Sequence, residues 1–188
     1  PVLRLIDGQI HSFWFNRKGE TGELVHAIYG IEEDSLKEVA VERLEGNYYN
    51  PVFVQGTNKL LARRDEDKNQ GFVMLEVRRD GLKELFDFGA RTDHLTFMPG
   101  NMTEEMSVIE DNEGSYSLFW IEKVYNNGHL FYTKVDENGE VITPPKEIQI
   151  IPAHSKGIGL QVIFQKDRFV VFYTELRGGQ LNSSNICY

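Results

Sequence analysis

Three short phrases of the same composition recur along this sequence and constrain its fold more than any other feature. Each consists of Lys, Glu and an aliphatic residue: Lys37-Glu38-Val39, Lys83-Glu84-Leu85 and Lys146-Glu147-Ile148. Each follows an apolar segment that begins near a glycine, and that segment follows another one centred on an aromatic or long side chain. A pattern that returns in the same order is typical of repeat proteins. The chain is therefore predicted to be an array of similar β-units.

Four units can be aligned, and their strand and turn signals occur in the same order. The units span approximately residues 1–46, 47–89, 105–152 and 158–188, within one domain of residues 1–188. The third strand of each unit begins at a glycine: Gly22, Gly71, Gly128 and Gly179. These glycines are roughly 50 residues apart, which is the period of four-stranded propeller blades. The predicted fold is an all-β propeller of four-stranded antiparallel blades.

The fourth unit is shorter than the others. Its signals stop in a third strand at Tyr188, whereas each of the first three units adds a fourth strand that carries the Lys-Glu phrase. We therefore expect about four blades, the last one incomplete, with exposed apolar faces at both ends of the array. The chain is predicted to associate with itself, or to belong to a longer chain that supplies further blades.

One segment also fits a helix. Residues 35–44 place Leu36, Val39, Ala40 and Leu44 at helical spacing. The matching segments of the next two units, 82–88 and 146–151, are too short for helices, so we expect a strand in all three places. The predicted strands are apolar nearly throughout, a pattern found in sheets that are covered on both faces. Neighbouring blades would cover each sheet in this way.

The repeats resemble the blades of sialidase-like (BNR-type) β-propellers. The resemblance is greatest in His129-Leu130-Phe131-Tyr132-Thr133-Lys134-Val135 and the following Asp136-Glu137-Asn138-Gly139-Glu140-Val141. The Asp-box of that family is a turn of the form Ser-x-Asp-x-Gly-x-Thr-Trp, and here Asp136 stands one position early. The resemblance implies the propeller fold and slightly favours a location outside the cytoplasm. The residues themselves leave the compartment open.

The catalytic residues of sialidases have no clear counterparts in this sequence. The resemblance implies three arginines that hold a substrate carboxylate, a tyrosine nucleophile paired with a glutamate, and an acid/base aspartate. Arg4, Arg63 and Arg168 occupy differing positions in their units, and no local motif pairs a tyrosine with a glutamate. We therefore name no catalytic residue and expect a non-enzymatic binding or interaction module. A sialidase-like glycoside hydrolase is the alternative.

Composition and charge exclude several classes of protein. The formal net charge is -9, and binding to nucleic acid needs clustered Lys and Arg, so no nucleic-acid partner is predicted. The apolar runs are strand-sized, far below the roughly 20 residues of a membrane-spanning helix. The single cysteine, Cys187, excludes an internal disulfide framework and a cysteine-based zinc cluster.

No metal or cofactor is predicted. Asp65, Asp67 and Asn69 have the spacing of a calcium loop, with Glu76 where a closing ligand would stand. The loop glycine is misplaced, however, and Glu76 falls well inside the expected strand, so we interpret the segment as a solvated acidic turn. The five histidines lack the His-x-x-x-His spacing of helical zinc sites. Three of them fall in strands and are expected to be packed or at an edge: His11, His26 and His129.

Candidate ligand-binding residues lie in the connections between units. In a propeller these connections share one rim with the loops between second and third strands. The longest connection, 89–105, carries charged, aromatic and methionine side chains, and long irregular segments of compact domains are commonly functional. The candidates are Tyr48, Tyr49, Arg91, His94 and His154. The expected ligand is a protein or a glycan.

Two tryptophans hold matching positions on second strands. Trp14 and Trp120 each precede the register glycine by the same number of residues, and the counterparts in the other units are Arg63 and Tyr173. Aromatic side chains at such positions are expected to pack between blades. If they were exposed instead, a lectin with repeated aromatic pockets would be the further alternative.

Overall fold

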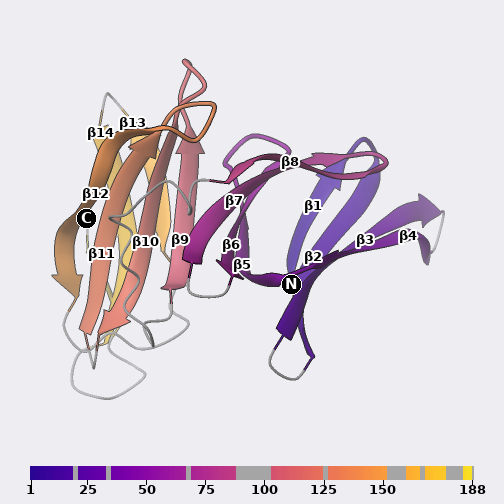
Figure 1. Cartoon of the computed structure of the whole chain (residues 1–188), viewed down its shortest axis with the longest axis horizontal. Coiled ribbons are helices and arrows are strands. Elements are labelled where there is room, and N and C mark those ends of the chain that lie inside the picture. Colours follow the sequence, from indigo (N-terminus) through magenta and orange to yellow (C-terminus); the bar gives the residue numbers. More distant parts are fainter. Residues whose placement is uncertain are drawn as a thin grey trace. The chain divides into compact units, whose positions relative to one another are not determined.

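The computed structural model describes residues 1–18, 21–32, 35–66, 69–87, 103–124, 127–151, 160–165, 168–176 and 184–187. Within these ranges all regular structure is β-strand, as predicted, and the strands form four antiparallel sheets (Figure 1). The chain divides into two compact units, Pro1–Arg91 and Thr92–Tyr188. Each unit contains two sheets.

The first unit consists of two four-stranded meanders, because each strand pairs with the next one in the chain (Figure 1). The first sheet has the order β1-β2-β3-β4 and the second sheet has the order β5-β6-β7-β8. The strands are β1 (Val2–Ile6), β2 (Gln9–Lys18), β3 (Thr21–Glu32), β4 (Ser35–Glu45), β5 (Asn47–Phe53), β6 (Lys59–Glu66), β7 (Asn69–Arg78) and β8 (Gly81–Asp87).

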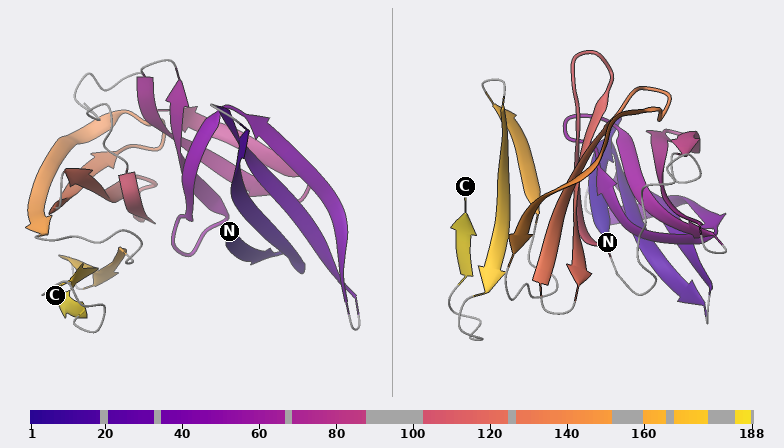
Figure 2. Two further views of the ribbon diagram at one scale, coloured as in Figure 1. Left: turned by 90° about the horizontal axis from the view of Figure 1, so that it is seen from below. Right: turned by 60° about the vertical axis from the view of Figure 1, so that its left-hand side comes forward.

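The second unit repeats this arrangement, and Figure 2 shows its strands from two further directions. The third sheet has the order β9-β10-β11-β12, and the fourth sheet, β13-β14-β15, has three strands among the described residues. The strands are β9 (Thr103–Glu110), β10 (Tyr116–Val124), β11 (Asn127–Val135), β12 (Val141–Ile151), β13 (Gln161–Gln165), β14 (Arg168–Leu176) and β15 (Ser184–Cys187). A shorter last sheet was expected from the sequence.

Local sequence explains where strands form and turn. Asp7 and Gly8 both have positive φ, 48° and 78°, and connect β1 to β2 in the tight hairpin that an Asp-Gly pair favours. The segment with helical spacing is β4, which pairs with β3 along its whole length, so the prediction of a strand there is confirmed. Its cross-strand partners decide the conformation, because local spacing alone fits both structures.

The two sheets of the first unit pack face to face. Phe13 and Leu24 of the first sheet share one buried cluster with Leu60, Val73 and Leu75 of the second sheet. The Phe13 ring also meets the Phe53 ring of β5 edge to face, with 5.4 Å between centroids. An aromatic pair of this geometry stabilises the contact by about 1 kcal/mol beyond the area that it buries.

The second unit is built on the same principle. Phe119 and Ile109 of the third sheet form a buried cluster with Val162 of the fourth sheet, and Phe169 packs against it. The rings of Phe119 and Phe169 are 5.1 Å apart. In both units, therefore, an aromatic side chain on the second strand of one sheet contacts the sheet that follows it in the chain.

Each sheet has two faces, because side chains alternate along a strand. We call the face that carries Phe13 or Phe119 the following face, and the opposite one the preceding face. Trp14 and Trp120, the next residues, lie on preceding faces; Trp120 is buried and Trp14 is half-buried. The prediction that these rings are packed is confirmed for Trp120.

The second sheet corrects one predicted match. Ala62 packs against the first sheet, so Ala62 holds the position of Trp14, and its neighbour Arg63 points to the other face. The predicted match of Arg63 to Trp14 was wrong because it was counted from Gly71. Gly71 lies one residue further from its hairpin than Gly22 does, as the strand pairing shows.

Candidate functional site

The rim predicted to bind a ligand can be followed on the second sheet. Tyr48 and Tyr49 of β5 pair with Arg64 and Arg63 of β6, close to the hairpin between β6 and β7. This placement confirms, within this sheet, that the connection from the first sheet and that hairpin share one edge. The Tyr48 side chain is only 5% exposed and belongs to the core between the first two sheets.

The other candidates have a less complete description. The backbone of Tyr49 is part of β5, whereas its side chain lies outside the described residues, as do Arg91, His94 and His154. The strands that lead to them end at the expected edge. Asp87, the last residue of β8, pairs with Val73 near the start of β7, and Ile151, the last residue of β12, pairs with Gly128 at the start of β11. Ligand binding by these candidates stays a prediction.

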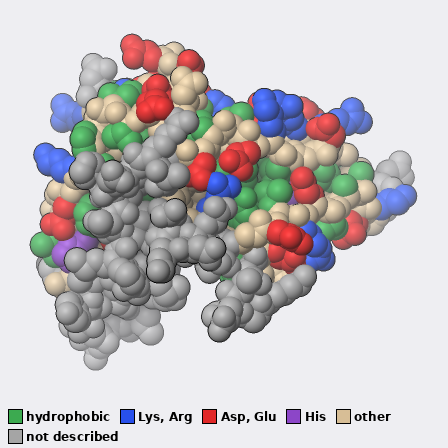
Figure 3. All heavy atoms as spheres, viewed as in Figure 1, with side chains coloured by type: hydrophobic (Ala, Val, Ile, Leu, Met, Phe, Trp, Pro, Cys, Tyr) green, Lys and Arg blue, Asp and Glu red, His purple; other side chains and the backbone are tan. Residues whose placement is uncertain are grey.

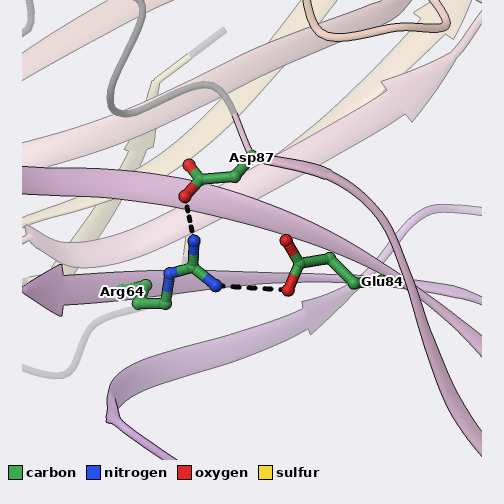
Figure 4. A network of polar contacts seen from close by, with 3 residues as sticks. All are labelled: Arg64, Glu84 and Asp87. Atoms are coloured by element: carbon green, nitrogen blue, oxygen red, sulfur yellow. Dashed lines mark hydrogen bonds and ion pairs between the residues drawn. The ribbon is translucent and has the colours of Figure 1, made fainter.

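A network of charges lies beside Tyr48. The guanidinium of Arg64, on β6, donates to Glu84 at 3.2 Å and to Asp87, both on β8 (Figure 4). To reach them the side chain crosses β7, where the paired residue is Gly71 and no side chain stands in the way. The network therefore ties the second strand of this sheet to its fourth strand.

The positive charge of Arg64 is balanced by side chains of its own sheet, which indicates a structural role. Partial burial lowers the pKa of Arg64, but the hydrogen bond with Tyr48 and the charges of Asp87 and Glu84 raise it by more, so the net pKa lies above the usual value. Both terminal nitrogens of the guanidinium are engaged by carboxylates of the same sheet. An arginine that binds a substrate carboxylate would need at least one such edge for the ligand.

A second polar group is buried between the first two sheets. Nδ1 of His11 and Nε2 of His26 are 2.9 Å apart and share one hydrogen bond, in which the ring that carries the proton donates. The Phe13 ring stacks on His26 at 4.4 Å with an angle of 7° between the planes. Both histidines are buried, so the prediction that they are packed is confirmed.

The histidine pair is connected to the second sheet through Glu42 of β4. One carboxylate oxygen of Glu42 lies 3.5 Å from Nδ1 of His26 and accepts a 2.9 Å hydrogen bond from the backbone N–H of Leu82, at the start of β8. Arg4, which pairs with His11 in the β1–β2 register, lies over the Phe53 ring at 5.4 Å. A charge on the pair would therefore appear at the contact between two sheets.

Burial keeps both histidines neutral. Burial lowers the pKa of His26 to about 4, and the neighbouring His11 adds to that shift. Burial also lowers the pKa of His11, while the negative charge of Asp7 raises it by less. Burial therefore opposes protonation of either ring while the first and second sheets are packed together, because a charged imidazole is stabilised by water.

The structure offers no support for a metal site in its described part. No group of three or more His, Cys, Asp or Glu side chains there could hold an ion. Glu76 pairs with Lys59 at the far end of the β6–β7 hairpin from Asp65, which pairs with Gln70. The carboxylate of Glu76 instead accepts a 2.7 Å hydrogen bond from Arg78. Glu76 therefore cannot close a loop at residues 65–69.

Sequence reasoning missed both polar networks. Arg64, Glu84 and Asp87 match no sequence motif. Arg64 pairs with Gly71, but that pairing is known only from the register of β6 and β7. His11 and His26 were recognised as strand residues, but their contact depends on the register of β2 and β3, which pairs Phe13 with His26. The sequence alone does not reveal that register.

Comparison of the sequence with protein-family models and with curated proteins finds no match. By its described structure the chain is an all-β protein with four antiparallel sheets. Among the described residues, no helix is long and apolar enough to cross a membrane. Acidic and basic side chains are interspersed on the face drawn in Figure 3.

Proposed function

We propose that the chain is a non-enzymatic binding module built from blades of a sialidase-like β-propeller. The observation that carries this proposal is the repeated stacking of one sheet's following face on the next sheet's preceding face. Phe13 meets Phe53 in the first unit, and Phe119 meets Phe169 in the second. A propeller consists of four-stranded antiparallel blades that succeed one another in this manner.

The proposed ligand surface is the rim that carries the connections between sheets. Tyr49, Arg91, His94 and His154 would contact the partner, a protein or a glycan. Tyr48 would act behind them, since its side chain is buried and holds Arg64 in place. Loops on a rigid β-scaffold are common binding sites, because the scaffold fixes their ends while their sequence is free to vary.

Engagement of the partly buried Arg64 favours binding over hydrolysis. A sialidase needs arginines with free guanidinium edges to hold the substrate carboxylate. Arg64 lies at the proposed rim, but Glu84 and Asp87 occupy both of its terminal nitrogens. The network is therefore suited to hold the rim in shape.

Arrays of immobilised glycans and proteins, probed with the purified chain, test this function. We expect specific binding by the wild type and at least about ten-fold weaker affinity for the variant Tyr49→Ala/His94→Ala/His154→Ala. Arg79→Ala is the matched control, because Arg79 is exposed in the turn between β7 and β8, at the end of the second sheet opposite the proposed rim. Equal affinity of the triple variant and the wild type would refute the assigned surface.

Enzymatic activity is checked separately with a fluorogenic sialoside. If hydrolysis exceeds the level measured with heat-denatured protein, the proposed function as a binding module is wrong and the alternative, a glycoside hydrolase, takes its place. The propeller arrangement is checked by electron microscopy of the assembled protein, in which the sheets should be arranged radially around one axis. Sheets arranged as a flat sandwich would contradict it.

A further inference from the structure

A chain of polar contacts runs from the first sheet to the second, toward the end of these sheets that lies away from the proposed rim. Nδ1 of His11 and Nε2 of His26 are 2.9 Å apart, and Nδ1 of His26 lies 3.5 Å from one carboxylate oxygen of Glu42. The same oxygen accepts a 2.9 Å hydrogen bond from the backbone N–H of Leu82, close to the turn between β7 and β8. The strands β2, β3 and β4 of one sheet are therefore connected to β8 of the other.

The start of β8 provides a fitted position for this carboxylate. Gly81 has a positive φ of 147°, and a side-chain carbon there would lie only 3.0 Å from the bonded oxygen of Glu42. Glycine therefore leaves the space that the carboxylate fills. Val77, the cross-strand partner of Leu82, bonds through its own backbone N–H and C=O to Asn58. The N–H of Leu82 is thus held by a side chain of the other sheet.

The contacts fix which ring nitrogens carry protons. A carboxylate only accepts hydrogen bonds, so the Nδ1 of His26 that faces Glu42 carries the proton of this ring. Nε2 of His26 is then an acceptor, and Nδ1 of His11 donates to it. Nε2 of His11 is left with a lone pair, and this buried nitrogen has no hydrogen-bond partner among the described residues. The neutral chain therefore ends in a base that can accept one more proton.

The carboxylate favours Leu82 while both rings are neutral. At 3.5 Å the distance from His26 to Glu42 is too long for a strong hydrogen bond, whereas Glu42 and Leu82 are at full hydrogen-bond distance. The Glu42 side chain is 37% exposed, so water can take its place at Leu82 when it moves.

A proton that binds Nε2 of His11 can charge the ring beside Glu42. As that N–H bond forms, His11 passes its Nδ1 proton across the shared hydrogen bond to Nε2 of His26, so the pair gains one proton. His26 then carries protons on both nitrogens and is a cation next to a carboxylate. A charge-assisted hydrogen bond is stronger than a neutral one, so it draws Glu42 from Leu82 to His26. Repulsion between two charged rings limits the uptake to one proton.

Several other charged groups lie on the faces that pack around the pair. Arg4 of β1 pairs with His11 and lies over the Phe53 ring. Asp7, in the turn after β1, raises the pKa of His11, but by less than burial lowers it. Further charged or titratable groups on these faces are Lys37 on β4 and, on the second sheet, Tyr48, Arg64, Glu84 and Asp87. The last four are engaged with one another in the Arg64 network, which leaves Glu42 to respond to a charge on His26.

We propose that His11, His26 and Glu42 form a latch between the first and second sheets, which opens when the histidine pair takes up one proton. In the closed form Glu42 holds Leu82 and with it the start of β8. In the open form Glu42 pairs with His26, and the start of β8 is released from the first sheet. The two forms differ in the group that Glu42 contacts, so proton binding shifts the population between them.

The latch opens in mild acid. In the closed form burial lowers the pKa of His26 to about 4 from its ordinary 6.5, whereas the ion pair of the open form raises it again. The open form therefore binds the proton more tightly and gains population as the pH falls from 6.5 toward 4, and the closed form prevails above 6.5.

Amide hydrogen exchange of the whole chain, resolved by NMR, tests the latch. When the pH is lowered from above 6.5 to about 5, the protection factor of the Leu82 N–H should fall at least about ten-fold, after correction for the intrinsic pH dependence of exchange. The N–H of Leu75, a buried residue within β7 of the same sheet, should keep its protection. Ring nitrogen chemical shifts above pH 6.5 should show the proton on Nδ1 of both histidines.

The variant Glu42→Gln separates the latch from general effects of acid. Its amide oxygen can still accept from the N–H of Leu82, but it carries no charge that attracts a protonated His26. We expect full protection of Leu82 above pH 6.5 and little loss on acidification. Glu38→Gln is the matched control and should respond as the wild type does. Glu38 is an exposed glutamate of the same strand, but it pairs with Tyr29 and so lies on the opposite face.

Four results would each overturn the proposal. They are unchanged protection of Leu82 in acid, an equal acid response in Glu42→Gln and the wild type, a proton on Nε2 of either ring in the neutral pair, and simultaneous loss of protection at Leu82 and Leu75. The last result would report unfolding of the whole first unit. The latch does not depend on the proposed function, because the ligand arrays use rim residues at the other end of these sheets.

Discussion

The two units fill the same inter-sheet position with different chemistry. In the first unit Phe13 pairs across the strands with His26, and the two rings stack at 4.4 Å. In the second unit Phe119 pairs with Tyr132 in the same place, and these rings are tilted by 43° at 5.0 Å. Both pairs fill the space between successive sheets with planar rings, but only the imidazole can change its charge near neutral pH.

The fourth-strand residues that pair with the two rings also differ between the units. His26 pairs with Glu42 on the fourth strand, whereas Tyr132 pairs with Lys146. Both units therefore fill this position with a planar ring, which packs well between sheets, although the charge beside the ring differs. The comparison teaches that equivalent packing can place an imidazole in one unit and a phenol ring in the other.

The largest expected effect comes from removal of the shared aromatic anchor. Phe13→Ala should lower the free energy of unfolding of the first unit by about 4 kcal/mol, because a fully buried phenylalanine is replaced by a cavity. Phe119→Ala should do the same to the second unit. Hydrogen exchange should accelerate mainly in β2 and β3 for the first variant, and in β10 and β11 for the second. Equal acceleration in both units for one variant would contradict separate cores.

The next largest expected effect is a difference between the two units in how acid changes their free energy of unfolding. The pKa of His26 is lowered to about 4 from its ordinary 6.5, so the unfolded state binds more protons between these values. The stabilisation from the neutral ring is complete above pH 6.5 and is lost as the pH falls toward 4. The loss in the first unit should be on the order of 3 kcal/mol, and denaturant unfolding at a series of pH values measures it.

The equivalent position in the second unit supplies the control for that experiment. His26→Tyr places the side chain of the second unit in the first, and should remove most of the acid dependence between pH 6.5 and 4. In the second unit, Asp111 has a pKa lowered below its ordinary 3.8, with opposing burial outweighed by its hydrogen bonds to Lys134, Ser115 and Glu113. Its stabilisation is therefore lost only at lower pH. An unchanged acid dependence in His26→Tyr would assign it to other groups.

The smallest expected effect comes from removing one carboxylate charge at a time from the Arg64 network. Asp87→Asn should destabilise the first unit by about 1 kcal/mol, and Glu84→Gln by about half as much. The reason is exposure, since 24% of the Asp87 side chain and 47% of the Glu84 side chain is accessible. Chemical denaturation at low and moderate salt should show the difference. A larger effect of Glu84→Gln would mean that the exposed ion pair dominates.

Much of the fold could be predicted because its signals are local. The Asp7-Gly8 hairpin, the strand at Ser35–Glu45 and the antiparallel order of the strands in each sheet of the described residues were all expected from turn residues. The match of Arg63 to Trp14 failed by one residue, since a glycine marks a hairpin only approximately. Side-chain alternation turns a slip of one residue into a change of face.

Less of the candidate site could be predicted. Tyr48 was selected as a ligand-binding residue because of its place in a connection, and the sequence could not show that its ring is buried in the core. Arg64 was overlooked because its partners, Glu84 and Asp87, follow some twenty residues later on a strand that is not adjacent to its own. Contacts across an intervening strand depend on register and have no sequence motif.

The sequence by itself determined that this protein is all-β and antiparallel, because turn residues alternate with apolar segments of strand length. Only the tertiary structure decided which side of each strand meets the next sheet. That choice places His26 beside Phe13 in the core and leaves Leu3 exposed on the opposite face. The reason is geometric: propensity acts on neighbouring residues, whereas burial depends on which sheet covers a face.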